Sequence, residues 1–446
     1  MTAGVRRLVL LGAVCVIAVV VAALGWLSPE RDEAIGSAPN ARPAPTGSAV
    51  ATPEAFDPST ASSAPLDDAT TAENTSGAPT SAAPTTSTLP PTTTQPATTV
   101  APVGQRSLSV VLTGDILTEN PVITAGEAGA AGTGARFDFT PVFAPITPFV
   151  QSFDLAICQM EIPIGRPGES FGGIGRSPYG GNLIVAPYEM GPAIKATGFD
   201  RCTTASNHSY DVGDAGIDST IDALEQLGIS WSGTARRPEE AVPTTFEARG
   251  IRLAHLHSKK RSNTDLHADE WRMNHTTDPD RVAADVVAVR QAGAELVIVS
   301  IHLFKEMTEQ PIAENRDFAA AVTASADIDA LVHHGPHVVQ GFEVLNDTPV
   351  WWSIGNLLSG MARPGQTGRY SDPRSRDGLA AVLRFQEDGP GNWQLATSSV
   401  ILCNEESSRI VYPGVAAAQD PALDPALREQ LQGCVDRTRD AIPDAQ

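Results

Sequence analysis

Residues 329–337 read DALVHHGPH, and this stretch decides how the rest of the chain is interpreted. An apolar run typical of a buried strand passes directly into three histidines around a Gly-Pro turn. Imidazole is a good ligand for Zn, Fe or Mn, and a turn can aim two rings at one point. The stretch therefore predicts a metal site at a strand end. A solvent-exposed loop that happens to be rich in histidine is the alternative.

Four other apolar runs also end in residue types that bind metals. They are 109–113 before Gly114-Asp115, 154–158 before Gln159-Met160-Glu161, 201–205 before Ser206-Asn207-His208, and 296–301 before His302. In open α/β sheets, ligands bind beyond the carboxyl ends of the strands. Taken singly, these residues have simpler interpretations as a turn, a loop or cap, and a buried histidine. Together, the five strand ends predict one shared site.

The residue types also suit one another chemically. Carboxylates bridge or neutralise divalent ions, an Asn amide oxygen is a weak neutral ligand, and imidazoles complete the shell while leaving positions open for water. A pair of metals about 3.5–4 Å apart needs roughly this many donors. We therefore expect divalent metal ions, two in number, with Mn, Zn and Fe as the candidates.

Six blocks of sequence resemble, in order and spacing, those of the CapA family. They are 111–115, 159–161, 206–213, 300–302 with Glu306, 334–341 and 352–356. That family is associated with bacterial capsule and poly-γ-glutamate synthesis, and its domain resembles calcineurin-like metallophosphatases. The resemblance covers about residues 107–385. It implies an α/β fold, a four-layer α/β/β/α sandwich with two mixed sheets between helices.

The resemblance also implies roles for individual residues. The implied metal ligands are Asp115, Glu161, Asn207, His208, His302, His334 and His337. His302, His334 and Glu306 are the implied catalytic residues, although Glu306 could be a surface charge. Asp211 would orient an imidazole, or would instead be an acid at a helix N-terminus, while Ser353 and Asn356 would shape the loop beside the site. Some neighbouring residues depart from the family pattern, including Gln159, Ser206, Leu303, Phe304 and His333.

The N-terminal quarter of the chain has a different composition. Residues 8–27 are uncharged and apolar, follow Arg6 and Arg7, and are long enough to span a membrane as a helix. Residues 1–34 are thus predicted to be a cytoplasmic end and a transmembrane anchor; a cleaved signal peptide is the alternative. Residues 35–105, rich in Pro, Thr, Ser and Ala, are predicted to be a disordered linker. The extracytoplasmic domain is expected over 106–446.

Net charge and cysteine content limit the classes of binding partner and the cellular compartment that we expect for this chain. A formal net charge of −21 argues against nucleic acid, and an anionic substrate would need a local positive site. Outside the membrane disulfides are permitted, and Cys403 with Cys434 is a plausible pair. Cys158 and Cys202 are interpreted first as small buried hydrophobes, which would pair only if their strands are neighbours.

Several local structures are predicted as well. Helices are expected over 187–197, 214–228, 278–292, 314–326 and 424–440, and a strand over 398–402. Residues 255–261, HLHSKKR, are interpreted as a solvated loop, with a role in holding an anionic substrate as the alternative. Residues 361–377 are expected to form a mobile loop that could act as a lid.

The leading functional hypothesis is a metal-dependent hydrolase or transferase of the cell envelope. It would act on an anionic envelope polymer such as poly-γ-glutamate, or on its precursor, with metals stabilising an oxyanion and a histidine or Glu306 moving protons. One alternative is a noncatalytic scaffold that organises membrane-bound polymer synthase subunits. Another is a metallophosphoesterase that acts on other envelope phosphates.

Overall fold

The computed structural model describes residues 105–265 and 269–446. The predicted anchor at 8–27 and nearly all of the predicted linker lie outside these residues. Among the helices of the described part, none combines the length and apolar character needed to cross a membrane.

A first sheet of eight strands forms one half of the domain, in the order β16-β15-β14-β1-β2-β5-β6 with β13 also paired to β1. Its strands are β1 (Ser107–Ile116), β2 (Leu155–Met160), β5 (Arg201–Thr203), β6 (Ser230–Ser232), β13 (Asn356–Leu358), β14 (Asp377–Glu387), β15 (Trp393–Asn404) and β16 (Val411–Pro413). The strands β1, β2, β5 and β6 run parallel, whereas β14, β15 and β16 extend the sheet in antiparallel fashion.

A second sheet of six strands has the order β11-β12-β10-β9-β8-β7. Its strands are β7 (Thr245–Ala248), β8 (Ile251–Lys259), β9 (Leu296–His302), β10 (Ala330–His334), β11 (Phe342–Leu345) and β12 (Thr348–Trp351). The four central strands are parallel and both edge strands are antiparallel. A small separate hairpin pairs β3 (Gly172–Arg176) with β4 (Asn182–Val185).

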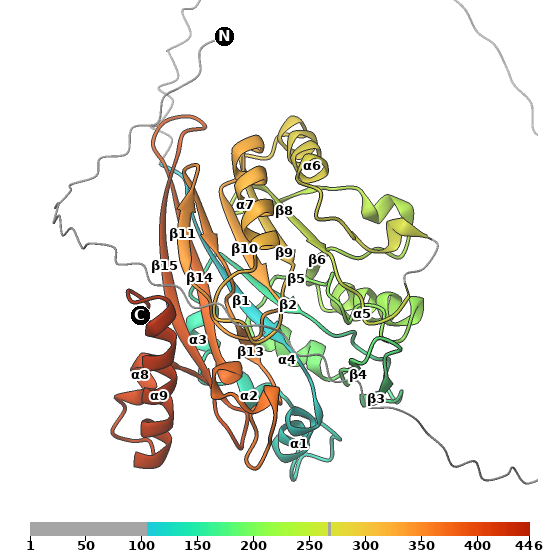
Figure 1. Cartoon of the computed structure of the whole chain (residues 1–446), viewed down its shortest axis with the longest axis vertical. Coiled ribbons are helices and arrows are strands. Elements are labelled where there is room, and N and C mark those ends of the chain that lie inside the picture. Colours follow the sequence, from blue (N-terminus) through green and yellow to red (C-terminus); the bar gives the residue numbers. More distant parts are fainter. Residues whose placement is uncertain (1–104, 266–268) are drawn as a thin grey trace, which may run out of the picture. The chain divides into compact units, whose positions relative to one another are not determined.

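The two sheets pack face to face, and helices cover their outer faces (Figure 1). Alternate residues of β1 and β2 point inward onto residues of β8, β9 and β10, so one apolar core lies between the sheets. The outer face of the first sheet carries α1 (Asn120–Gly129), α2 (Thr140–Phe143), α3 (Thr147–Val150), α4 (Met190–Thr197) and α5 (Asp214–Gln226). The second sheet is covered by α6 (Pro279–Gln291) and α7 (Ala313–Ser325). The predicted α/β sandwich is therefore present.

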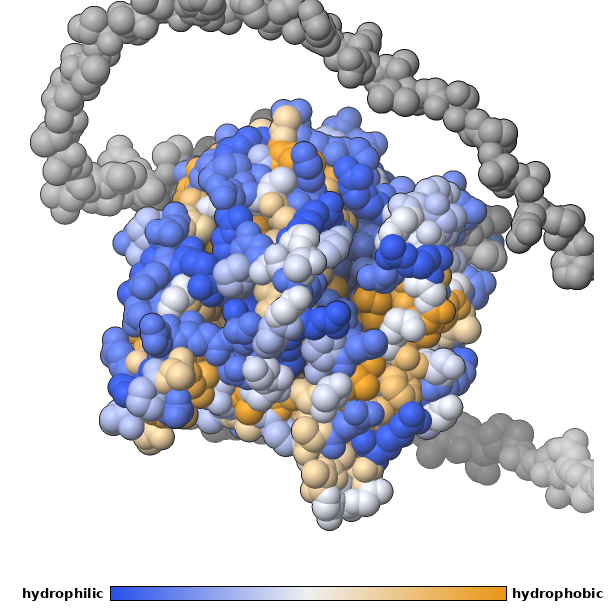
Figure 2. Space-filling view, turned by 60° about the horizontal axis from the view of Figure 1, so that its bottom comes forward, coloured by the Kyte–Doolittle hydropathy of each residue, from blue (hydrophilic) through white to orange (hydrophobic). Residues whose placement is uncertain are grey.

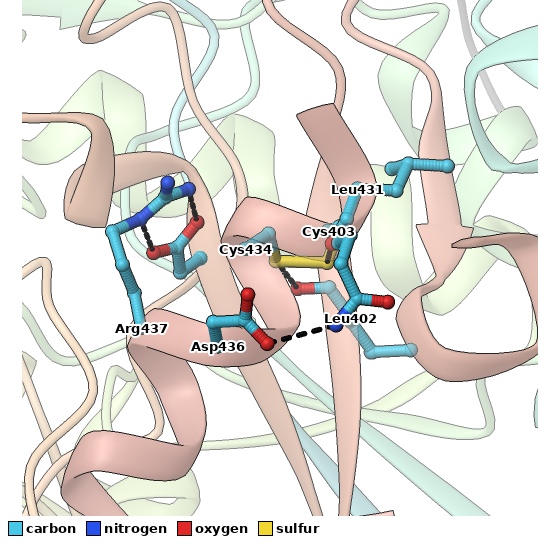
Figure 3. Close-up of a disulfide and its surroundings, with 8 residues drawn as sticks. Leu402, Cys403, Leu431, Cys434, Asp436 and Arg437 are labelled. Atoms are coloured by element: carbon cyan, nitrogen blue, oxygen red, sulfur yellow. Dashed lines mark hydrogen bonds and ion pairs between the residues drawn. A yellow bond between two sulfur atoms is a disulfide. The ribbon is translucent and has the colours of Figure 1, made fainter. Parts of the chain in front are cut away.

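The C-terminal helices α8 (Gly414–Ala418) and α9 (Pro425–Ala441) pack on β14 and β15. A disulfide between Cys403 and Cys434 joins β15 to α9, as predicted (Figure 3). Beside it, Arg437 on α9 donates two hydrogen bonds to Asp377, of 2.6 and 2.7 Å. These links hold the helix pair against the sheet.

Cys158 and Cys202 are disulfide-bonded, which corrects their first interpretation as small buried hydrophobes. The condition for their pairing is met, because β2 and β5 are neighbours and place Cys158 directly opposite Cys202. The bond therefore ties together two strands that run toward the same end of the sheet.

Candidate metal centre

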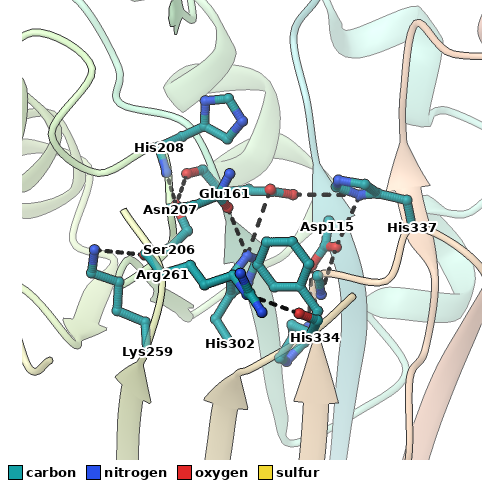
Figure 4. A network of polar contacts seen from close by, with 12 residues as sticks. Asp115, Glu161, Ser206, Asn207, His208, Lys259, Arg261, His302, His334 and His337 are labelled. Carbon is teal, nitrogen blue, oxygen red and sulfur yellow. Dashed lines mark hydrogen bonds and ion pairs between the residues drawn. The ribbon is translucent and has the colours of Figure 1, made fainter. Parts of the chain in front are cut away.

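The parallel strands of both sheets end on one side of the molecule, and the predicted site residues meet there (Figure 4). Asp115 lies near the end of β1 and Glu161 directly follows β2, while His302 and His334 are the last residues of β9 and β10. His334 stands opposite His302 in the strand register. Asn207 follows β5, and His337 lies in the turn after β10. All six side chains are buried.

Glycine is required where backbones approach one another at this site. A Cβ on Gly114 would lie 2.1 Å from the carbonyl oxygen of Gly355, so a side chain there would push β1 away from the turn before β13. Gly335 has φ +101°, and a Cβ on it would lie 2.4 Å from the ring of Phe304. His337 itself has φ +62°, a conformation that non-glycine residues seldom adopt outside functional or tightly constrained positions.

Carboxylates and imidazoles alternate at short distances. Asp115 Oδ1 lies 3.3 Å from His334 Nδ1, and Asp115 Oδ2 lies 3.5 Å from His337 Nδ1. Glu161 Oε2 is 3.9 Å from His337 Nδ1, and Glu161 Oε1 is 3.7 Å from His302 Nε2. One ligand atom from each of Asp115, Glu161 and His337 lies within 4.8 Å of the others, which is close enough for a shared ion.

The pKa values of the two acids of this cluster are shifted in opposite directions. Burial would raise the pKa of Asp115, but the close contacts of its carboxylate with His334 and His337 lower this pKa far below its usual range. Burial raises the pKa of Glu161 well above its usual value, because the nearby histidine compensates only part of the desolvation. Although burial opposes a charged ring, Glu161 and Asp115 raise the pKa of His337 to about 9.

Unpaired polar atoms show that the residues fit a bound cation. Among the described residues, Asp115 Oδ1, both carboxylate oxygens of Glu161 and His334 Nδ1 are buried and have no hydrogen-bond partner. Leaving so many buried acceptors unsatisfied is costly, and native proteins rarely do so without a reason. A divalent cation would satisfy these atoms and favour ionised Glu161.

His302 and Asn207 form a second part of the cluster. His302 Nε2 lies 2.9 Å from Asn207 Oδ1, while His302 Nδ1 lies 3.4 Å from Gln159 Nε2. A neutral ring that donates from Nε2 and accepts at Nδ1 satisfies both contacts, and burial lowers the pKa of His302 so that the neutral form is favoured. Gln159, a departure from the family pattern, thus fixes the orientation of a predicted ligand.

His208 stands apart from the acidic cluster and has its own acid. Its Nδ1 lies 2.6 Å from Asp211 Oδ2, which also accepts a 2.7 Å hydrogen bond from the Ile184 backbone. Asp211 therefore orients an imidazole, the first of its two interpretations, while the acid in the first turn of α5 is Asp214. Asn263 lies 3.0 Å from His208 Nδ1 and accepts a hydrogen bond from Asn207. Asn263 carries no motif and was missed by sequence analysis.

A cavity of about 350 Å³ opens above the site and is lined by Asn207, His208 and His337. Glu306 is in its wall but is already engaged, since it accepts a 2.6 Å hydrogen bond from Tyr370 and forms an ion pair with Arg369. Both partners lie within 361–377, the segment expected to be a mobile loop that could act as a lid. This segment contains the short 3₁₀ helices Arg369–Ser371 and Pro373–Arg376 and is fastened to the cavity wall.

The side of the molecule toward which β1 runs is shown in Figure 2. Hydrophilic residues cover much of this face, and apolar patches gather toward one side.

The two loop residues predicted to shape the site are buried within this end. Ser353 Oγ accepts a 3.2 Å hydrogen bond from the Gly355 N–H, and Asn356 Oδ1 lies 3.0 Å from His337 Nδ1. Asn356 also pairs with Asp115 in the sheet, so it joins two of the predicted ligands.

Three histidines that were not predicted as ligands have surroundings of another kind. His333 faces the helical layer, where its Nδ1 lies 3.0 Å from Asn315 Nδ2 and its ring packs beside Trp352. His255 and His257 are not in a solvated loop; that prediction was wrong, because both are buried on β8. The alternation of apolar and polar residues in 251–259 was a strand signal that the cationic residues after it obscured.

The model of the family described as bacterial capsule synthesis protein PGA_cap matches residues 109–361, more than half of the chain. The chain belongs to this family. The match begins on β1, which carries Asp115, and ends beyond β13, so it spans the whole set of strand ends that form the site.

Two curated relatives of this capsule synthesis family member are similar over part of their length. The capsule biosynthesis protein CapA of Bacillus anthracis is 24% identical over 274 residues, which are 58% of this chain and 62% of that protein. The PGA biosynthesis protein CapA of Bacillus subtilis (strain 168) is 24% identical over 210 residues, 45% of this chain and 51% of that protein. The matches thus span between one half and two thirds of these relatives.

One solved structure similar to the capsule synthesis family member is the calcineurin-like phosphoesterase YfkN from Bacillus subtilis. It is 13% identical, with a TM-score of 0.40, and the match covers 76% of this chain and 99% of that chain. A 5′-nucleotidase precursor from Thermus thermophilus is 12% identical with a TM-score of 0.36, covering 74% of this chain and 59% of that chain.

Proposed function

We propose that this protein is a membrane-anchored, extracytoplasmic, metal-dependent hydrolase or transferase that processes an anionic capsular polymer such as poly-γ-glutamate, or its precursor. The observation that carries the proposal is Glu161. Its buried carboxylate has no hydrogen-bond partner for either oxygen among the described residues, yet it lies between His302 and His337. A buried acid in this state is typical of a ligand to a metal ion rather than of a structural residue.

Six residues would hold divalent metal there: Asp115, Glu161, Asn207, His302, His334 and His337. The bound metal would supply Lewis-acid stabilisation of the oxygen that becomes negative during attack on a phosphoryl or acyl centre. Gln159 would orient the ring of His302 through Nδ1, so that Nε2 faces Asn207 and Glu161. Asn356 would hold His337 through its Nδ1.

Proton transfer is assigned to His208 rather than to Glu306. The Nδ1 of His208 faces Asp211, and His208 lines the cavity into which a substrate would enter. A carboxylate on Nδ1 fixes the orientation of the imidazole, so Nε2 is available to transfer a proton to a leaving group. Glu306 is held by Arg369 and Tyr370, an arrangement that suits a tether for the loop.

Local positive charge at the cavity supports an anionic substrate despite the net charge of −21. Arg363 lines the cavity and its side chain is exposed. Arg261 lies beside the site, where its Nε donates a 3.1 Å hydrogen bond to the carbonyl of Phe304 (Figure 4). An extended polyanion could lie across both arginines while one of its bonds reaches the metal centre.

The anchor and linker extend the proposal to location. Residues 8–27 would hold the chain in the membrane, and the linker at 35–105 would let the domain reach a polymer, or membrane-bound polymer synthase subunits, at a distance of up to about 200 Å. Extraction of membranes with alkaline carbonate tests this part. Release of the full-length chain into the soluble fraction would contradict an anchor.

The central test compares Glu161→Gln with Glu169→Gln, an exposed acid eight positions later in the chain. We expect elemental analysis of the full-length protein to find Mn, Zn or Fe in the wild type and in Glu169→Gln, and to find little in Glu161→Gln. Hydrolysis of poly-γ-glutamate and of a phosphodiester should follow the metal content. Equal metal in all three proteins would overturn the proposed site.

The same variants separate the enzyme from the scaffold. In cells that lack the wild-type protein, loss of polymer with Glu161→Gln at normal protein abundance would support an enzyme. Full restoration of polymer by that variant would instead support a noncatalytic scaffold for polymer synthase subunits. Hydrolysis of phosphodiesters with no effect on polymer would support a phosphoesterase for other envelope phosphates.

A further inference from the structure

A second and larger cavity, of about 660 Å³, lies on the flank of the domain. It is bounded by the edge strand β6 of the first sheet, by β8 of the second sheet, and by the segment around Trp271. Cavities of this size are in the range that proteins use for small organic ligands. None of the predicted metal ligands lines it.

At this edge, the side chains in the layer between the two sheets change from apolar to polar. The apolar core between the sheets is built by β1, β2, β14 and β15 on one side and ends before β5. On β5, Cys202 points to the outer core, so Arg201 and Thr203 face inward. The inner face of β8 presents His255 and His257 at the same edge. Polar side chains therefore replace the apolar core where the cavity lies.

Arg201 is a buried cation with no acidic partner. Its side chain lines the cavity, yet the residue is only 6% exposed. Its Nη atoms donate to Ser230 Oγ at 3.1 Å and to the His255 carbonyl at 3.5 Å, and its guanidinium stacks 4.5 Å from the Phe246 ring centre. Among the described residues no carboxylate pairs with it, and its Nε has no hydrogen-bond partner. Such an unpaired buried charge is costly.

Two of the acids that line the cavity, Glu240 and Asp285, have cationic partners of their own. Glu240 pairs with Arg236 at 2.9 Å, and Asp285 lies 3.5 Å from Arg281. Deeper in, His255 Nε2 contacts Ser300 Oγ at 2.9 Å and its Nδ1 is without a partner among the described residues. His257 Nδ1 accepts from the Ala205 N–H, so the neutral ring carries a proton on Nε2, which is likewise unpartnered within that part of the chain.

We propose that this cavity, which is distinct from the metal centre, binds a small organic anion whose carboxylate or phosphate pairs with Arg201. Trp231 and Trp271 in the wall provide aromatic surface for the remainder of the ligand, which suits a sugar ring or another body of similar size. Arg recognises carboxylate and phosphate alike, so the shared chemistry is an oxyanion on a compact organic body. Inorganic anions alone would leave most of the cavity unfilled.

The test uses the full chain treated with a chelator, so that anions bound at the metal centre do not contribute. Glucose 1-phosphate, glucuronate and neutral glucose are titrated by calorimetry and by tryptophan fluorescence. We expect at least one of the two anionic sugars to bind at least tenfold more tightly than glucose. The phosphate and carboxylate probes also distinguish which anion is preferred.

Arg201→Met should weaken binding of the preferred anion at least tenfold, whereas Arg384→Met, on an exposed arginine of β14, should leave it unchanged. Because Arg201→Met removes an unpaired buried charge, the melting temperature of the ligand-free variant should be equal to or above that of the wild type. A purely structural arginine would instead lower it. If Arg201→Met does not fold, Trp271→Ala is used, with an expected affinity loss of at least fivefold.

Three outcomes would overturn the proposal: no binding of either anionic sugar at concentrations up to about 10 mM, equally tight binding of glucose, or unchanged affinity in Arg201→Met. These results are independent of the metal centre. Failure of Glu161→Gln to lose metal would leave the flank cavity untouched, and failure of anion binding would leave the metal centre untouched.

Discussion

Adjacent histidines at the end of β10 have opposite surroundings, and substitution should separate their roles. His334 faces Asp115 in the acidic cluster, whereas His333 packs among Asn315, Phe318 and Trp352. We expect His333→Ala to lower the free energy of unfolding by about 2–4 kcal/mol, because it leaves a cavity and an unpaired amide. It should retain bound metal. His334→Ala should lose most of the metal and cost less stability.

Denaturant unfolding and elemental analysis on the same preparations check this pair. The two variants are matched controls for each other, since they remove the same side chain one position apart. Loss of metal in His333→Ala with retention in His334→Ala would reverse the assignment.

The sequence predicted which residues form the site better than it predicted the contacts that each side chain makes. Asp115, Glu161, Asn207, His302, His334 and His337 meet because parallel strands end together, and this follows from apolar runs followed by polar residues. The interactions of Gln159 and Asn263 with these residues depend on tertiary contacts between segments far apart in the chain. No periodicity or spacing carries that information.

At the scale of elements, the two disulfides should differ in effect. Cys158–Cys202 closes a separation of 44 residues and joins the strands that lead to Glu161 and Asn207, whereas Cys403–Cys434 closes 31 residues and joins β15 to α9, neither of which carries a predicted ligand. Chain-entropy arguments give about 4 kcal/mol of stabilisation for each. Replacing either pair with alanines should lower stability by a similar amount. Only the Cys158–Cys202 change should also weaken metal binding, by severalfold.

Urea unfolding and metal titration of the two double variants measure this difference. Equal metal affinity in both would show that β2 and β5 keep their alignment without the covalent link.

The segment 361–377 should be held to the cavity wall by Glu306. Tyr370 donates to Glu306 Oε2 and Arg369 forms an ion pair with the same carboxylate, so Tyr370→Phe removes the hydrogen bond, whereas Glu306→Gln removes the ion pair and weakens the hydrogen bond. We expect both variants to speed cleavage by trypsin within this segment severalfold, and their effects to be less than additive in the double variant because both act on one contact. Additive effects in the double variant would show that the two residues act separately, and a loss of activity only in Glu306→Gln would restore Glu306 as a catalytic group.

Element boundaries were predictable where one face of a helix is apolar. The helices expected at 214–228, 278–292 and 314–326 correspond to α5, α6 and α7, within two residues at each end. The helix expected at 187–197 begins later, at Met190, because Pro187 to Glu189 form a turn before it. Residues 255–261 were misassigned because the buried edge between the sheets is polar, so β8 lacks the continuous apolar run of a core strand.

At the scale of the whole molecule, buried histidines should make the fold sensitive to acid. Burial lowers the pKa values of His255 and His257 well below the usual 6.5, and lowers that of His333 to about 3. Below pH 6.5 the unfolded chain therefore binds protons that the folded chain does not. The free energy of unfolding then falls as the pH falls, by up to about 1.4 kcal/mol per pH unit for each histidine.

Buried acids work in the opposite direction, because burial raises the pKa of Asp377 to about 6 and that of Glu161 well above its usual value, so the folded state binds protons that the unfolded chain lacks. The overall slope of stability against pH is the balance of these groups, and comparing a histidine variant with the wild type isolates the contribution of one ring. Urea unfolding of the chelated proteins between pH 6.5 and 5 measures both slopes. His333→Asn removes one titrating ring while keeping a polar side chain beside Asn315, so its slope should be shallower by up to about 1.4 kcal/mol per pH unit. An identical slope in the variant would mean that His333 is protonated in the folded state, which its apolar surroundings oppose.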